Sequence, residues 1–215
     1  MGGVGPQLRH AGLNLADDPR ETRAEVESDV FGFWVFLMSD AVAFALLFAL
    51  YGTMVGATAG GPGPADEFKL GTAFVETLIL LSSSFTFGLA SIALKRDRTA
   101  KRLVLWLGVT LALGLAFLGM EVHDFVTMVS HGAEASRSAF LSGFFVLVGT
   151  HGLHVTIGVI WIAVMLVQIG GEGRDERVRI NLVRLSLFWH FLDVIWIAIF
   201  SIVYLQGLIP PGGAA

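Results

Sequence analysis

The chain has 215 residues, of which 54% are hydrophobic and 15% are charged, and its mean hydropathy is +0.72. This composition excludes a water-soluble domain of such length, because too few polar side chains remain to cover the apolar ones. The net charge of -4, without a long run of Lys or Arg, excludes nucleic acid as a partner, and the absence of cysteine excludes disulfides, thiolate metal sites and c-type haem attachment.

Five segments are long and apolar enough to cross a bilayer as helices. A helix rises about 1.5 Å per residue and the hydrocarbon core is about 30 Å thick, so one crossing takes about 20 apolar residues. In chain order the segments are 31–55, 70–94, 103–130, 139–168 and 180–208. We therefore predict an all-α fold, a polytopic bundle of five transmembrane helices. A polar cytoplasmic segment at 1–30 is expected to precede it, and an external tail at 209–215 to follow it.

The basic residues are distributed unevenly between the two ends of these helices. Two of them, Lys69 and Arg137, lie on one side of the predicted bundle. The twelve on the other side are Arg9, Arg20, Arg23, Lys95, Arg96, Arg98, Lys101, Arg102, Arg174, Arg177, Arg179 and Arg184. Because basic connectors stay in the cytoplasm, the N-terminus is predicted to be cytoplasmic. An odd number of spans then places the C-terminus outside.

Several ionisable side chains lie at membrane depth, where each charge costs about 2.5 to 3.5 kcal/mol on the mildest scale. They are Asp40, Glu76, Glu121, Asp124, His151, His154, His190 and Asp193. Three pairs among them are spaced by three residues, which places both members on one face of a helix. Since acids and imidazoles occur on different helices, we expect carboxylate to histidine contacts across the bundle that neutralise both groups.

Three functional hypotheses stand beside this structural interpretation. The first is a b-type haem held by His190 with either His151 or His154, because two axial ligands must approach iron from opposite faces. The second is an ion-coupled transporter in which acids and histidines relay protons. The third is a zinc or copper site formed by His151, His154, Glu76 and His190.

Two motifs in the last two predicted helices indicate a family. They are GTHGLHV at 149–155 and SLFWHFLDVIW at 186–196. Three shorter motifs precede them in the order FGFW–LMSD at 31–40, VET with SSS at 75–84, and GME at 119–121. Together they resemble the signature of subunit III of haem–copper terminal oxidases, and the similarity covers about 31–208, which includes every predicted span.

The resemblance implies an accessory subunit with no catalytic centre, cofactor or metal of its own. Mitochondrial-type relatives have seven helices, whereas this chain begins where their third helix begins. The shortened form is most similar to subunit III of bacterial cytochrome bo-type ubiquinol oxidases, with cytochrome c oxidase subunit III as the alternative. Such a complex passes electrons from quinol to dioxygen in aerobic respiration and translocates protons across the bacterial inner membrane. The C-terminus would then be periplasmic.

The same resemblance implies the partners and cofactors. The expected partners are oxidase subunits I, II and IV and structural phospholipids, which the family binds in a cleft between helix groups. Subunit I is expected to carry haem b, haem o or a, copper and ubiquinol. Asp40 matches a position where cytochrome c oxidase relatives have a buried, carbodiimide-reactive glutamate that is one methylene longer. We interpret the eight ionisable residues as intramembrane polar contacts, with a proton-handling or lipid-contacting role as the alternative.

Overall fold

The structure is a computed structural model that describes residues 19–60, 70–96, 100–171 and 176–205. Within these ranges it consists of helices and short turns, without a strand. The helices are α1 (Pro19–Met54), α3 (Leu70–Arg96), α4 (Ala100–Ser130), α5 (Ala139–Gly171), α6 (Glu176–Ile199) and the π-helix η1 (Phe200–Leu205).

Five helical segments in this described part of the chain are long and apolar enough to span a membrane. They are Val30–Met54, Leu70–Leu94, Ala100–Ser130, Ala139–Gly171 and Val178–Leu205. The predicted all-α, five-span membrane architecture is therefore confirmed.

The ends of the first and last helices differ from the sequence prediction. Helix α1 begins at Pro19, so part of the polar segment before the first span is helical. Proline is tolerated in a first helical turn, and the Glu, Arg and Ala residues that follow have high helix propensity. The last span changes from α-helix to π-helix at Phe200. Its predicted end at Leu208 lies outside the described residues.

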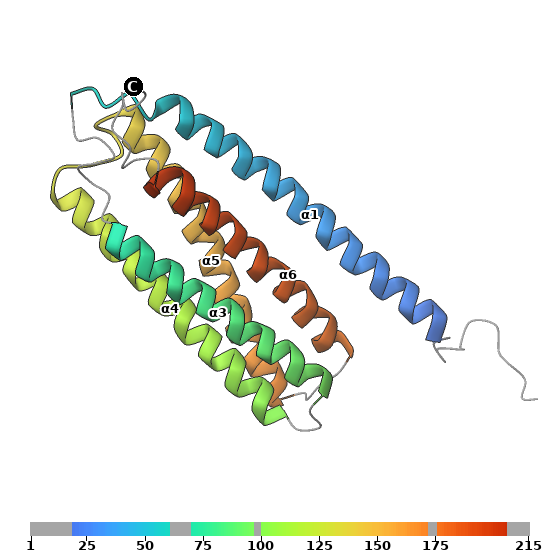
Figure 1. The fold of residues 1–215 in the computed structure, drawn as a ribbon. Helices are drawn as coiled ribbons and strands as arrows, with labels where there is room; N and C mark the ends of the chain where they lie inside the picture. The colour runs from blue at the N-terminus through green and yellow to red at the C-terminus, as the bar shows by residue number, and fades with distance from the viewer. Residues whose placement is uncertain (1–18, 61–69, 97–99, 172–175, 206–215) are drawn as a thin grey trace, which may run out of the picture.

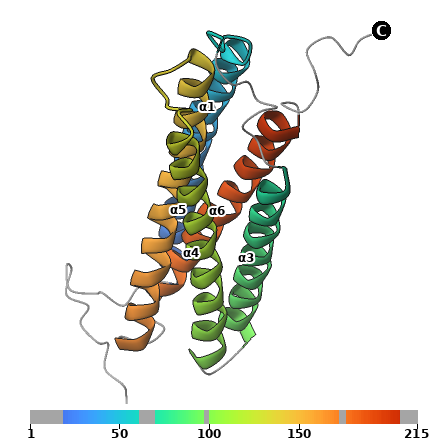
Figure 2. The ribbon, with the colours of Figure 1, turned by 90° about the vertical axis from the view of Figure 1, so that its left-hand side faces the viewer.

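The helices form a layered bundle in which α3 and α4 lie side by side, α5 packs on α4, and α6 packs on both α5 and α3 (Figures 1 and 2). Helix α1 packs against α5 and α6. Its most apolar stretch is only 11% buried, compared with 28 to 44% in the other spans. Exposed side chains such as Trp34, Val42 and Leu46 suit a lipid environment, which solvates apolar groups without protein cover.

The centre of the bundle is built around two tryptophans of α6, Trp189 and Trp196, which are almost fully buried. Gly114 on α4 and Gly158 on α5 make room for the ring of Trp189. A Cβ atom would lie 2.9 Å from this ring at Gly114 and 3.0 Å from it at Gly158. Small residues commonly let membrane helices approach each other closely, and at these two positions they admit an indole between the helices.

Each of these indoles also forms a hydrogen bond to α3. Trp189 Nε1 donates to Ser83 Oγ and Trp196 Nε1 donates to Thr77 Oγ1, both at 3.0 Å. Both hydroxyls donate in turn to a carbonyl of the preceding turn of α3, at 2.7 Å in each case. The indole N–H groups are thus satisfied in a region that water does not reach, and they fix the register of α6 against α3.

The end of α4 is a Schellman turn, which places its C-terminal glycine in a left-handed conformation. Gly132 has φ +81°. The N–H of Ala133 donates to Met128 O and that of Gly132 donates to Val129 O, both at 3.0 Å. Arg137 then donates to the Gly132 carbonyl at 2.8 Å, which fastens the connection that leads into α5.

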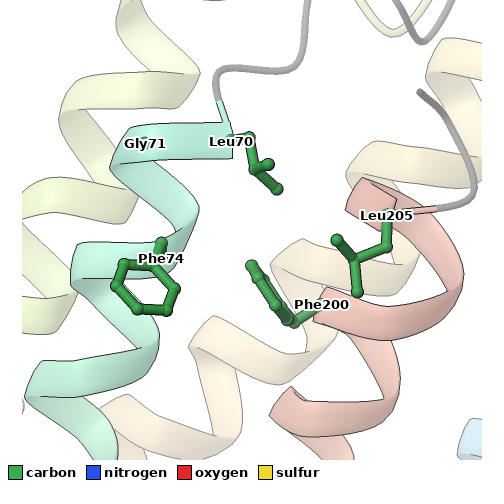
Figure 3. Close-up of a pocket in the computed structure, with 5 residues that line it drawn as sticks. All are labelled: Leu70, Gly71, Phe74, Phe200 and Leu205. Carbon is green, nitrogen blue, oxygen red and sulfur yellow. The ribbon is translucent and has the colours of Figure 1, made fainter.

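An apolar cavity of about 440 Å³ lies where the start of α3 faces η1. Figure 3 shows Leu70 and Phe74 of α3 on one side and Phe200 and Leu205 of η1 on the other. The lining includes Gly71 and offers no charged group. Because ligand specificity needs placed polar groups, this cavity is not a candidate reaction site.

Candidate functional site

Asp40 on α1 and His154 on α5 meet across the helix boundary. Asp40 Oδ2 lies 3.6 Å from His154 Nε2, and both side chains are about four-fifths buried. His154 Nδ1 lies 2.7 Å from the Thr150 carbonyl, which can only accept, so this nitrogen carries the hydrogen. Nε2 is therefore the nitrogen that faces the acid. The imidazole also packs against Phe44, with ring centroids 5.3 Å apart.

His151, one turn earlier on α5, is fully buried and faces a different environment. Its Nε2 donates to the backbone carbonyl of Leu192 at 3.3 Å. The ring lies edge-on to Phe117, with centroids 5.8 Å apart, and is tilted against Trp196 at 5.2 Å. Nδ1 has no hydrogen-bond partner among the described residues. The expected contact with a carboxylate is therefore absent from the described surroundings of His151.

Three acidic residues lie on the neighbouring helices α3 and α4. Glu76 and Glu121 are buried and interact electrostatically with each other, and Glu76 also interacts with the half-buried Asp124. The Glu121 carboxyl lies directly over Gly152 of α5, where a Cβ atom would be 2.6 Å from Oε2. In the described structure the Oε1 atoms of Glu76 and Glu121 have no hydrogen-bond partner. In the described structure the neighbours of these two acids are other acids and the buried phenol of Tyr204, and for Glu121 also the backbone of α5. The sequence predicted an imidazole beside them.

His190 and Asp193 form the third group, on α6. His190 Nδ1 lies 2.7 Å from Ser84 Oγ of α3 and 3.5 Å from Asp193 Oδ2. The acid and the imidazole are therefore neighbours within one helix, and the contact that crosses to α3 is made by a serine. The His190 side chain remains 45% exposed, whereas that of Asp193 is buried.

The hydroxyl partners in these contacts were not among the residues predicted from the sequence. Ser84 contacts His190, while Ser83 and Thr77 accept from the two indoles. The signal was available in the serine run at 82–84 and in the spacing of seven residues between the two tryptophans of α6. Two turns of a helix return to the same face, so both indoles are expected on one face of α6.

The geometry of these groups bears on the metal hypothesis. No three His, Asp or Glu side chains of the described ranges come together as possible metal ligands. The four residues considered for zinc or copper are instead distributed over separate contacts: His154 with Asp40, His151 with Leu192, Glu76 with the other acids, and His190 with Ser84.

These features define a class: a multi-pass membrane protein whose buried polar groups contact one another and the backbone between helices. The sequence profile described as "Cytochrome c oxidase subunit III" matches residues 21–208. The chain belongs to this family, which confirms the resemblance seen in its motifs.

Individual relatives cover nearly the whole chain. "Cytochrome bo(3) ubiquinol oxidase subunit 3" of Pseudomonas aeruginosa is 49% identical over 178 residues, 83% of this chain and 85% of the relative. "Quinol oxidase subunit 3" of Bacillus subtilis is 43% identical over 202 residues, 94% of this chain and 98% of the relative. "Cytochrome c oxidase subunit 3" of Bacillus sp. (strain PS3) is 38% identical over 190 residues, 88% of this chain and 91% of the relative.

Proposed function

We propose that this chain is subunit III of a bacterial quinol oxidase, an accessory subunit that supports the catalytic subunit and carries no catalytic centre itself. The observation that carries the proposal is the similarity along nearly the whole chain to proteins named as subunit 3 of ubiquinol and quinol oxidases, at 43 to 49% identity. On this proposal haem and copper belong to subunit I, which oxidises quinol, reduces dioxygen and translocates protons. Subunits II and IV and membrane phospholipids are further partners.

The contacts of the buried polar groups support a structural role. Asp40 and His154 join α1 to α5, and Ser84 and His190 join α3 to α6. Interhelical polar contacts of this kind hold helices together in lipid, where apolar packing alone gives little preference for one partner. The chain would then act as a stable scaffold against which a larger subunit packs.

A cytochrome c oxidase is the second candidate, favoured by the relative of that name at 38% identity. The electron donor binds to other subunits, so the discriminating observation is the sequence of the partner subunit II. A set of Cys and His residues for a copper centre there indicates cytochrome c as donor. The absence of such a set supports quinol.

The proposal is tested by purification in mild detergent through an affinity tag on this chain. We expect a larger subunit to co-purify, together with the optical spectrum of haem and with quinol-dependent consumption of dioxygen. The chain released from that complex is expected to show no Soret band. A haem bound stoichiometrically to the released chain, or a monodisperse chain that co-purifies with no oxidase subunit, would contradict the proposal.

We also propose that the N-terminus is cytoplasmic and the C-terminus periplasmic in the bacterial inner membrane, on the basis of the distribution of Lys and Arg. The chain has no cysteine, so single cysteines can report on each side. Ser136→Cys, in the α4–α5 connection, is expected to react with a membrane-impermeant maleimide in intact spheroplasts. Ser28→Cys is expected to react only after lysis. The reverse labelling pattern would show that the topology is opposite to the one proposed.

A further inference from the structure

His190 is a polar side chain that is exposed near the middle of a membrane-spanning helix. It lies twelve residues from Val178 and fifteen from Leu205, the ends of its span. At ~1.5 Å per residue it is therefore roughly 20 Å from either end. Ser84, its neighbour on α3, is likewise near the centre of the span Leu70–Leu94. An imidazole at this depth cannot reach water, and hydrocarbon offers it no hydrogen bond.

Among the residues that the structure describes, polar contacts are made to only one nitrogen of the His190 ring. Ser84 Oγ and Asp193 Oδ2 both approach the same nitrogen, Nδ1, at 2.7 and 3.5 Å. Phe87 lies edge-on to the ring, with centroids 6.1 Å apart. No polar atom of the described residues is seen in contact with Nε2. The imidazole therefore has one nitrogen whose hydrogen-bonding capacity the described residues leave unused, and 45% of the side chain is exposed.

The residues around His190 form a narrow outward stripe on α6. Val183, Val194 and Ile197 are exposed and lie seven, four and seven residues from His190, which places all four side chains within one face of the helix. We call these four residues the His190 face. In Figure 1, α6 lies between α1 and α3, and exposed fractions of 42 to 64% show that these helices leave a large part of this face uncovered.

We propose that the His190 face docks a transmembrane helix of a neighbouring oxidase subunit, one that presents a hydroxyl or carboxamide side chain to His190 Nε2. Hydroxyl and carboxamide groups can both donate and accept a hydrogen bond. They therefore match Nε2 in either tautomer of the imidazole, with the hydrogen on Nδ1 or on Nε2. The flanking valines and the isoleucine suit the apolar surface of such a helix. The inference rests on the proposed membership of an oxidase complex.

Other occupants match this surface less well. A phospholipid headgroup lies at the edge of the hydrocarbon core, about 15 Å from its centre, and cannot reach His190. An acyl chain can cover the valines but leaves Nε2 without a partner. In a two-fold symmetric contact with a second copy, the His190 face would meet itself. Symmetry would give both Nε2 atoms the same role, two donors or two acceptors, so the two rings could form a hydrogen bond only by breaking the symmetry.

The proposal is tested in the whole oxidase complex with a photoreactive benzoylphenylalanine placed at Val194, one turn from His190. Leu153 on α5 is a matched control, because it is also near mid-span and similarly exposed, at 59% compared with 64% for Val194. We expect illumination to crosslink position 194 to another oxidase subunit, in higher yield than position 153. Adducts with phospholipid alone, a crosslinked dimer of this chain, or equal yields at both positions would overturn the proposal.

Two substitutions of His190 distinguish the role of Nδ1 from the role of Nε2. The amide of His190→Asn reaches about as far as Nδ1, whereas that of His190→Gln extends as far as Nε2. Retention of this chain during detergent washes of the complex is expected to fall on the order of threefold to tenfold with Asn and to stay near wild type with Gln. Equal loss in both variants would overturn the role of Nε2.

If the unsubstituted chain fails to co-purify with any oxidase subunit, the proposed function itself is wrong. Co-purification combined with lipid-only adducts at position 194 refutes only the docking face.

Discussion

Trp189 on α6 and Ser83 on α3 are joined by a hydrogen bond of 3.0 Å, although 106 positions separate them in the chain. The serine hydroxyl accepts from the indole and donates to a carbonyl of its own helix. Because the serine makes both bonds at once, the pair restricts how far α6 can rotate and shift along α3.

Ser83→Ala is expected to lower the free energy of unfolding by about 1 kcal/mol, because the buried N–H of Trp189 loses its acceptor. The exposed neighbour Ser82 provides the control, and Ser82→Ala should stay within about 0.5 kcal/mol of wild type. The measurement is unfolding of the purified chain by SDS, followed by tryptophan fluorescence. Equal effects at both serines would show that the hydrogen bond contributes nothing.

Gly114→Ala is expected to destabilise the bundle by about 1 to 3 kcal/mol, because the added methyl would meet the Trp189 ring at 2.9 Å. Gly119→Ala on the same helix is the matched control. A Cβ atom there meets nothing within 4 Å, and alanine favours a helix over glycine by up to about 1 kcal/mol. Opposite signs for the two variants in the same unfolding assay are the expected result. Destabilisation by both would point to a general loss of helix packing.

Asp40→Ala is expected to leave the haem spectrum of the purified complex unchanged while weakening the attachment of α1 to α5. The contact with His154 is 3.6 Å long and partly exposed, so its coupling energy in a double-mutant cycle with His154→Ala should be at most about 1 kcal/mol. Thermal stability of the complex measures the coupling, and spectroscopy measures the haem content. Loss of haem in the Asp40 variant would show that this residue acts beyond the helix boundary.

Gly132→Ala is expected to cost about 1 kcal/mol or more, because φ is +81° there and a Cβ atom is strained in that region. Gly132→Asn should cost less, since asparagine tolerates this conformation better than alanine. The order Gly, Asn, Ala in thermal stability checks the prediction. Gly108→Ala, within α4 and with free space at its Cβ position, controls for the general effect of replacing glycine in this helix.

The helix content of the fold could be predicted because it depends on hydropathy and length, which are properties of each segment alone. The π-helix from Phe200 could not, because α- and π-helical windings differ by one residue in hydrogen-bond spacing and share the same apolar composition. The start of α1 was missed for a related reason. Hydropathy indicates where the membrane-spanning part begins. The helix itself begins earlier, at Pro19, because the residues that follow favour helical structure in water as well.

The pairing of buried groups was only partly predictable. Spacing assigned each residue to a face, and the expected acid to imidazole contact between helices is present for Asp40 and His154. For Glu121 the outcome depended on Gly152, whose missing side chain lets the carboxyl settle on the backbone of α5. Such an approach depends on the rotation of two helices about their axes, which no property of either segment specifies by itself.

The sparse packing of α1 has a consequence for biogenesis. Among the described helices, α1 is synthesised first, yet it packs against α5 and α6, which are synthesised after α3 and α4. Until α5 and α6 are inserted, α1 is a single helix surrounded by lipid, and its apolar surface is compatible with that environment. Asp40 is the exception, because it has no imidazole beside it until His154 enters the membrane. Between the two insertions, the Asp40 carboxyl lies at membrane depth without the contact that the folded bundle gives it.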